Sequence, residues 1–186
     1  MEEKLTQKPS NCLKIVLFGP ESSGKTTLSR KLAAHYNCSW IPEYAREYLQ
    51  QKWEREQKIC EPKDLLPIGE GQMRLENEAA QSAEKLLICD TDLLETKVYG
   101  EAYYNGWCSP ELEYHALENT YDLYFLTYID IPWEADDLRD RPEQREEMFL
   151  QFKEALVTYR RPFVLLKGSL DERMATATEH LNILLP

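Results

Sequence analysis

The sequence predicts an α/β fold in which helices cover both faces of a five-stranded parallel sheet. Five short apolar runs, typical of buried strands, alternate with stretches in which apolar residues recur at helical spacing. This alternation favours parallel strands joined by right-handed crossover helices. We expect the strands at residues 13–18, 38–41, 86–89, 123–126 and 163–166.

Helices are expected where apolar side chains share one helical face. In chain order these stretches are 27–36, 43–49 and onward, 68–86, 93–104, 110–119, 148–159 and 170–184. Two helices have start signals: Ser109 and Pro110 supply a cap and a first helical residue, and Ser169 with Glu172 forms a capping box. Residues 56–67 contain two prolines and are expected to be a loop.

Length and composition predict one domain. The chain has 186 residues, of which 1–12 are polar and are expected to be a loose lead-in to a single domain at 13–186. The net charge of −11 disfavours nucleic acid and anionic membranes as partners. No apolar run reaches membrane-spanning length, no signal peptide is recognisable, and the cysteines form no C-x-x-C motif. We expect a cytoplasmic protein; the sequence leaves its oligomeric state open.

The chain carries the phosphate-binding P-loop pattern G-x-x-x-x-G-K-[ST] at residues 19–26, Gly-Pro-Glu-Ser-Ser-Gly-Lys-Thr. The motif follows an expected strand and precedes an expected helix, which is its usual setting. Lys25 would reach the β- and γ-phosphates of ATP, and the Thr26 hydroxyl would coordinate Mg²⁺. The expected ATP-binding residues are Gly19, Glu21, Ser22, Ser23, Gly24, Lys25, Thr26 and Thr27.

Acidic residues follow the second and third expected strands, and active sites of parallel sheets lie at such strand ends. Asp90 stands where a P-loop protein holds its metal, so Thr26 and Asp90 are the expected Mg²⁺ ligands. Asp92 could contact a substrate hydroxyl, act as a base or cap the next helix. Glu43 could orient or deprotonate an acceptor hydroxyl, or stabilise the helix that it precedes.

Arginines and aromatics accompany these acids. Arg139, Arg141 and Arg145 lie in or beside a polar segment at about 130–145, expected to be a lid whose arginines neutralise transferred phosphate. The alternative is a solvated charge run, since acidic residues are interleaved. Arg46 could clamp a phosphate or pair with a neighbouring glutamate. Tyr44 and Trp133 are best placed to stack on a base.

Four motifs in order, at residues 19–28, 43–47, 90–92 and 132–139, resemble the ribosylnicotinamide kinase domain of NadR-type proteins. The resemblance covers about residues 13–185. It implies a P-loop kinase fold that phosphorylates the 5′-hydroxyl of nicotinamide riboside with ATP, giving nicotinamide mononucleotide for NAD biosynthesis. The implied catalytic residues are Lys25, Glu43, Asp92, Arg139 and Arg145. The implied substrate-binding residues, with Trp133 added for its strand position, are Glu43, Tyr44, Arg46, Asp92 and Trp133.

Other functions remain open at this point. The histidine motif of the adenylyltransferase part of NadR-type proteins is absent from this sequence, so that activity is not implied. The chain could instead be a kinase of another nucleoside, a P-loop ATPase that signals to a protein partner, or a non-catalytic nucleotide-binding module. The intact Lys25, Thr26 and Asp90 speak against the last of these.

Overall fold

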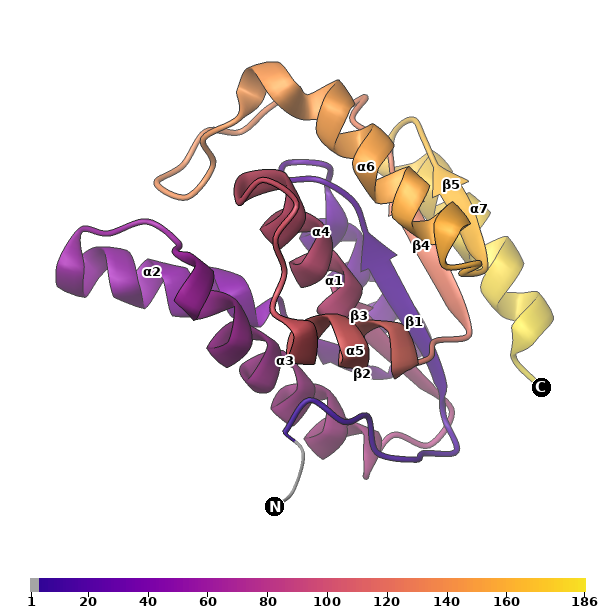
Figure 1. The fold of residues 1–186 in the computed structure, drawn as a ribbon. Coiled ribbons are helices and arrows are strands. Elements are labelled where there is room, and N and C mark those ends of the chain that lie inside the picture. Colours follow the sequence, from indigo (N-terminus) through magenta and orange to yellow (C-terminus); the bar gives the residue numbers. More distant parts are fainter. Residues whose placement is uncertain (1–3) are drawn as a thin grey trace.

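Five parallel strands form the centre of the fold, in the order β2-β3-β1-β4-β5 (Figure 1). The computed structural model describes residues 4–186. The middle strand places Val16 opposite Cys89 on one side and Tyr124 on the other. The strands are β1 (Leu13–Phe18), β2 (Ser39–Ile41), β3 (Leu86–Asp90), β4 (Leu123–Thr127) and β5 (Phe163–Leu166). The expected parallel sheet is confirmed.

Helices cover both faces of this sheet, as expected. They are α1 (Lys25–Tyr36), α2 (Tyr44–Glu56), α3 (Leu65–Ala80), α4 (Leu93–Tyr103), α5 (Pro110–Glu118), α6 (Arg145–Thr158) and α7 (Leu170–Leu184). On one face, α1 and α7 contribute Leu28 and Leu181 to a core with alternate strand residues. On the other face, α4 and α6 contribute Leu94 and Phe152. The strands are apolar along their length because both of their faces are buried.

The segment between β2 and β3 is more helical than the sequence predicted. The expected loop at 56–67 contains a short 3-10 helix, η1 (Pro62–Asp64), and the start of α3, which begins at Leu65 rather than at 68. Pro67 is tolerated because it lies in the first turn, where a missing N–H breaks no helical hydrogen bond. The same helix ends at Ala80 rather than at 86. A turn then leaves room for β3, with the Ala83 amide donating to the Ala79 carbonyl.

The N-terminal lead-in is held by the domain, contrary to the expectation of a loose segment. Residues 1–3 lie outside the described part of the chain. Leu5 is 1% exposed and packs in an apolar cluster with residues of α3 and α5 that include Met73 and Leu112. The amides of Gln7 and Lys8 donate to Asn119 and Asn77. One apolar residue and a set of side-chain amides therefore fix a stretch whose composition is polar.

The carboxyl ends of the strands gather the loops that carry the predicted motifs. The P-loop follows β1, Glu43 follows β2, and Asp90 is the last residue of β3. The connection from β4 to α6 is long and includes a 3-10 helix, η2 (Pro142–Gln144). Figure 1 shows this connection, in orange, extending toward α2. The lid expected at about 130–145 therefore lies on the same edge as the P-loop.

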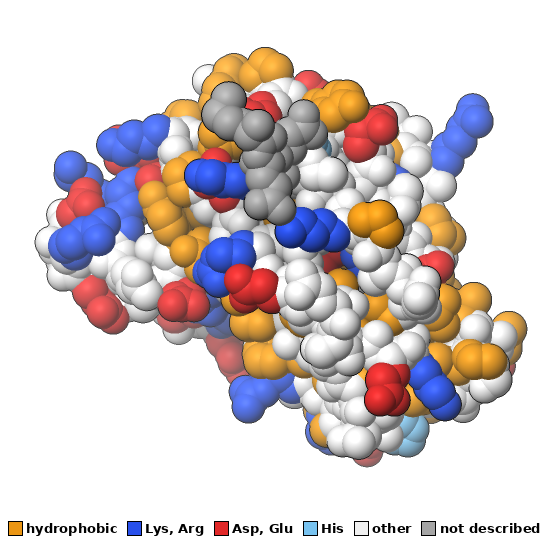
Figure 2. Space-filling view, turned by 90° about the horizontal axis from the view of Figure 1, so that it is seen from below, with side chains coloured by type: hydrophobic (Ala, Val, Ile, Leu, Met, Phe, Trp, Pro, Cys, Tyr) orange, Lys and Arg blue, Asp and Glu red, His pale blue; other side chains and the backbone are white. Residues whose placement is uncertain are grey.

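The surface mixes charges of both signs. Figure 2 shows acidic and basic side chains interspersed with hydrophobic ones over the face viewed from below, without a large patch of one charge among the coloured residues. Within residues 4–186, no helix is long and apolar enough to span a bilayer. All five cysteines are free thiols, and Cys89, expected in the core, is fully buried.

Candidate functional site

The P-loop has the backbone shape that its glycines predict. Gly19 has φ +146°, and a Cβ at this position would lie 2.6 Å from the Thr127 hydroxyl. Gly24 has φ +87°, and its Cβ would lie 3.1 Å from the Ile131 side chain. A larger residue at either position would meet both backbone strain and a close neighbour. The loop is further fixed by Ser23, whose Oγ lies 2.7 Å from the Thr127 hydroxyl of β4.

Lys25 lies under the P-loop with its ammonium group surrounded by acceptors. Its Nζ donates to the carbonyls of Gly19, at 2.7 Å, and Pro20, at 3.0 Å, and lies 3.2 Å from Glu95 Oε1. Burial lowers the pKa of Lys25, but the carboxylates of Glu95 and Glu43 outweigh it, so the pKa is raised overall. Lys25 is therefore a fixed positive charge, as a phosphate ligand must be.

Thr26 and Asp90 form a second contact between the P-loop and β3. The Thr26 hydroxyl donates to Asp90 Oδ2 at 2.5 Å. The other oxygen, Asp90 Oδ1, is buried and has no hydrogen-bond partner in the described structure. Burial, followed by the negative charge of Glu43, raises the pKa of Asp90 to about 6. A carboxylate oxygen without a partner beside a hydroxyl fits a cation that takes oxygen ligands.

Thr26 and Asp90 are too few to hold a metal that needs protein ligands alone, but they suit Mg²⁺. Within residues 4–186, no group of three or more His, Cys, Asp or Glu side chains is arranged to hold a metal. Mg²⁺ usually keeps several waters and binds through one or two carboxylates together with substrate phosphates. Thr26 and Asp90 therefore fit Mg²⁺ that arrives with a nucleotide.

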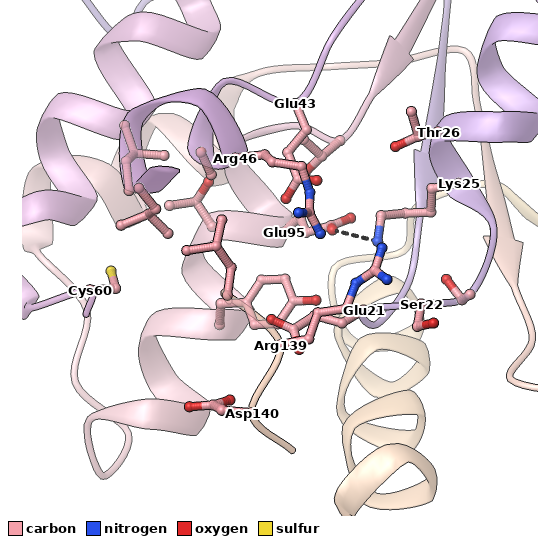
Figure 3. Close-up of a pocket in the computed structure, with 18 of the residues that line it drawn as sticks. Glu21, Ser22, Lys25, Thr26, Glu43, Arg46, Cys60, Glu95, Arg139 and Asp140 are labelled. Atoms are coloured by element: carbon pink, nitrogen blue, oxygen red, sulfur yellow. Dashed lines mark ion pairs between the residues drawn. The ribbon is translucent and has the colours of Figure 1, made fainter. Parts of the chain in front are cut away.

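A cavity of about 280 Å³ opens in front of Lys25. Its polar end is formed by the P-loop, and Figure 3 shows Glu43 and Arg46 facing Lys25 across it, with Glu95 paired directly to Lys25. Its other end is lined by apolar and aromatic side chains from the region between α2 and α4. These side chains are Leu49, Ile59, Cys60, Leu65, Ile68 and Tyr104. The cavity therefore joins the polar P-loop to an apolar surface, a combination that is typical of small-molecule sites.

Glu21 brings an unusual carboxyl into the polar end. Burial, followed by the charge of Asp140, raises its pKa from 4.5 to about 7. Lys25 and Arg139 lower the pKa again but do not cancel these effects. Near neutral pH, Glu21 is therefore partly protonated and can donate a hydrogen bond as well as accept one.

The segment expected to be a lid contacts three other parts of the fold beside the cavity. The Glu134 amide donates to the Ser22 hydroxyl at 2.8 Å, which joins the lid to the P-loop. Arg46 of α2 pairs with Asp136 at 2.9 Å. The third contact joins the lid to α4, where the Tyr103 hydroxyl donates to Asp140 at 2.6 Å.

Comparison with known proteins shows the family of this chain. The model of a family described as "AAA domain" matches residues 14–173. The chain belongs to this AAA domain family. The trifunctional NAD biosynthesis/regulator protein NadR of Salmonella typhimurium is 31% identical over 132 residues, which cover 71% of this chain and 32% of NadR. The chain thus spans about a third of that relative's length. The expected resemblance to NadR-type proteins is confirmed.

Solved structures confirm the P-loop kinase fold. A NadR protein in complex with NR superposes on the AAA domain with a TM-score of 0.72 and 21% identity, covering 91% of this chain and 50% of NadR. Deoxyadenosine kinase from M. mycoides with bound dATP superposes with a TM-score of 0.63 and 18% identity, covering 91% of this chain and 99% of the kinase. At these identities the likeness concerns the fold.

The fold brings most of the predicted site residues to one cavity. The predicted residues that line it are Glu21, Ser22, Ser23, Gly24, Lys25, Thr26, Thr27, Glu43, Arg46 and Arg139. Asp90 and Gly19 lie directly behind this wall, since Asp90 accepts from Thr26 and the Gly19 carbonyl accepts from Lys25. The motifs that are far apart in the sequence therefore meet as the strand order requires.

Four predicted residues lie elsewhere. Asp92 is 1% exposed and caps α4 by accepting from the Glu95 amide, which is the helix-capping alternative rather than a contact in the cavity. Tyr44 packs its ring over Gly71. The guanidinium carbon of Arg145 lies over the ring of Trp133, 5.7 Å from the ring centroid. Arg145 itself donates to the Ser22 carbonyl at 3.1 Å and thus reaches the P-loop backbone.

Other contributors to the site were not predicted from the sequence. Glu95, Tyr99 and Tyr103 of α4 line the cavity, and Arg173 of α7 donates to the Ser23 carbonyl at 2.6 Å. Glu95 carries one sequence signal, an acid in the first turn after the third strand, but such acids are common at helix N-termini. The others lie within ordinary helical patterns that do not distinguish them.

Proposed function

We propose that this chain is a Mg²⁺- and ATP-dependent kinase that phosphorylates the 5′-hydroxyl of a nucleoside, with nicotinamide riboside as its acceptor. The observation that carries the proposal is the single cavity that extends from the P-loop, past Glu43, to an apolar and aromatic end. Its polar end offers hydrogen-bond donors to phosphate, and its apolar end offers a surface to a flat base. The NadR relative, whose name includes NAD biosynthesis, and the NadR complex with NR support this choice of acceptor.

The donor half of the site is assigned to the P-loop. Its backbone N–H groups and Lys25 bind the ATP phosphates. Thr26 and Asp90 would hold Mg²⁺, which neutralises phosphate charge when bound. Arg139 of the lid lies over the same end of the cavity and neutralises the transferred group. Arg145 contributes by fixing the Ser22 carbonyl rather than by touching the phosphates.

The acceptor half is assigned to the side chains opposite Lys25. Glu43 orients the acceptor hydroxyl and takes its proton as the phosphoryl group is transferred. Arg46, which pairs with Asp136 here, changes partner when phosphate enters. The base lies at the apolar end, beside Tyr104 and the aliphatic side chains there, while Tyr44 and Trp133 support the site from outside it. Asp92 keeps the position of α4 and, through it, that of Glu95.

The cellular setting follows the same argument. The five cysteines are free, which suits the reducing cytoplasm in which ATP and nucleosides are exchanged. We therefore propose that the domain at 13–186 acts as a cytoplasmic kinase on small molecules.

The test is ADP formation from ATP and Mg²⁺ with nicotinamide riboside, uridine, thymidine or no nucleoside. We expect ADP to form with nicotinamide riboside, and the product to gain one phosphate by mass. Equal ADP formation without any nucleoside would support the ATPase alternative instead. ADP formation that depends only on uridine or thymidine would retain the kinase but overturn the choice of acceptor.

A further inference from the structure

Arg173 is a buried arginine that joins three segments of the fold. It lies in the first turn of α7, and its side chain is 3% exposed. Nε donates to the Gly168 carbonyl, Nη1 to the Ser23 carbonyl and Nη2 to the Tyr128 carbonyl, at 3.1, 2.6 and 2.9 Å. An ion pair with Asp130 completes the set. One guanidinium therefore holds the P-loop, the end of β4 and the turn before α7.

Asp130 and Gly168, which both contact Arg173, are also hydrogen-bonded to each other. Asp130 stands at the beginning of the lid, and its second oxygen accepts from the Gly168 amide at 2.6 Å. Gly168 has φ +83°, a backbone conformation that residues with a side chain rarely adopt, so glycine favours the shape of this turn. Because Asp130 balances the charge of Arg173, the pair adds little net charge to the phosphate site. Its effect there is geometric.

The hydrogen bond from Arg173 to the Ser23 carbonyl also fixes the direction of the Gly24 N–H, which belongs to the same peptide group. In a trans peptide, the C=O of one residue and the N–H of the next point in opposite directions. Arg173 holds the Ser23 carbonyl away from the cavity, and this turns the Gly24 N–H toward it. Arg145 does the same for the preceding peptide by holding the Ser22 carbonyl at 3.1 Å. Two guanidiniums thus fix successive P-loop peptides from behind.

We infer that Arg173 is a positioning residue for the phosphate donor: it acts through the Ser23 carbonyl to aim the P-loop N–H groups at the phosphates, and through Asp130 it ties the lid to the same point. This inference rests on the proposed function only in its donor half, the binding of ATP. Lysine cannot replace Arg173, because a single ammonium lacks the planar fork of donors that three carbonyls require.

The experiment compares Arg173→Lys and Arg173→Met with Arg161→Met. Arg161 is a matched control, since it also donates to backbone carbonyls, those of Ala116 and Leu117, but outside the cavity. The affinity for ATP with Mg²⁺ is measured by calorimetric titration, and stability by thermal unfolding of the free proteins. We expect both Arg173 variants to bind ATP about tenfold more weakly or worse, and Arg161→Met to bind it normally despite a lower unfolding temperature.

ATP binding within twofold of wild type by the folded Arg173 variants would overturn the inference. If Arg173→Met fails to fold, Arg173→Lys decides, because it keeps the charge that balances Asp130. The KM for nicotinamide riboside is expected to stay within twofold of wild type, which a general loss of structure would not allow. A wild-type protein that binds ATP but phosphorylates no nucleoside would refute the proposed function alone, since the ATP titrations would still decide the role of Arg173.

Discussion

Lys25 and Glu95 form an ion pair at the bottom of the P-loop, with Nζ 3.2 Å from Oε1 and both side chains almost fully buried. The second oxygen of Glu95 accepts from the Gly19 amide at 3.3 Å. One carboxyl group of α4 therefore holds both the lysine and the first glycine of the phosphate-binding motif. Burial raises the pKa of Glu95 well above its ordinary value, while Lys25 opposes the shift. Glu95 can therefore take up a proton when Lys25 is removed or binds another group.

Lys25→Met is expected to lower the turnover of ATP by about 10²–10³-fold, because the transferred phosphate loses the positive charge that Lys25 places beside it. The fold is expected to remain, since Glu95 can take up a proton once its partner is gone and then avoids an unpaired buried charge. ADP formation and thermal unfolding at pH 7 measure the two effects. The double variant Lys25→Met/Glu95→Gln is expected to unfold at nearly the same temperature as Lys25→Met.

The matched control for this prediction is Lys31→Met, at an exposed position of the same helix. It is expected to keep wild-type turnover. A Lys25→Met protein with turnover within fivefold of wild type would show that the P-loop lysine does not serve phosphoryl transfer.

Glu21→Gln is expected to stabilise the free protein above pH 7. The pKa of Glu21 is about 7 in the fold and near 4.5 in the unfolded chain, so the folded state binds the proton more tightly. As the pH rises from about 4.5 to about 7, the unfolded chain loses this proton first and the wild type is destabilised, by about 3 kcal/mol at most. Glutamine cannot ionise, so the variant escapes this loss.

Urea unfolding of both proteins between pH 4 and pH 8 measures the effect. The difference in unfolding free energy should be small at pH 4 and grow toward pH 7. Glu78→Gln is the control, because this side chain is 63% exposed on α3 and its removal should give a flat difference. A flat difference for Glu21→Gln as well would contradict the raised pKa.

Glu43→Gln is expected to lower kcat about 10²-fold while the KM for ATP stays within twofold, because an amide can orient a hydroxyl but cannot take its proton. The control is Glu47→Gln, one turn later on α2, where the carboxylate accepts from Gln51 on the surface. Steady-state kinetics with nicotinamide riboside measure both variants. If Glu43→Gln raised the KM for the nucleoside with kcat unchanged, Glu43 would bind the acceptor without acting as its base.

The fold was predictable wherever burial follows local sequence. β1 and β5 have the predicted bounds because each is a mainly apolar run that stops at a residue unsuited to a buried strand, Gly19 and Lys167 respectively. The start of α3 was misplaced because Pro67 reads as a break, whereas a proline in a first turn is compatible with a helix. The lead-in could not be predicted, since the burial of Leu5 depends on residues of α3 and α5 far along the chain.

In the site, as in the fold, local motifs were predictable and contacts made through packing were not. The P-loop is contiguous in sequence, and its ligands follow from one pattern. Glu95 and Arg173 reach that loop only through packing, 76 positions from Gly19 and 150 positions from Ser23 respectively. Asp92 shows the opposite case, because its place after β3 suggested a ligand, while the turn at Thr91 directs its side chain into the core. The direction of a side chain at a strand end is set by that turn.

Tyr124→Phe tests the place of Asp92 in the core. The Tyr124 hydroxyl donates to Asp92 Oδ2 at 2.7 Å, and both residues are buried. Removing the hydroxyl leaves a buried carboxylate oxygen without its donor, so the unfolding free energy is expected to fall by about 1–3 kcal/mol. Tyr36→Phe is the control, because that hydroxyl donates to the exposed Asn182 and its loss should cost little.

Asp92→Asn keeps the helix cap but not the charge, and turnover of the folded protein should stay within twofold of wild type. An Asp92→Asn protein of normal stability that has lost its turnover would restore Asp92 as a ligand of the substrate.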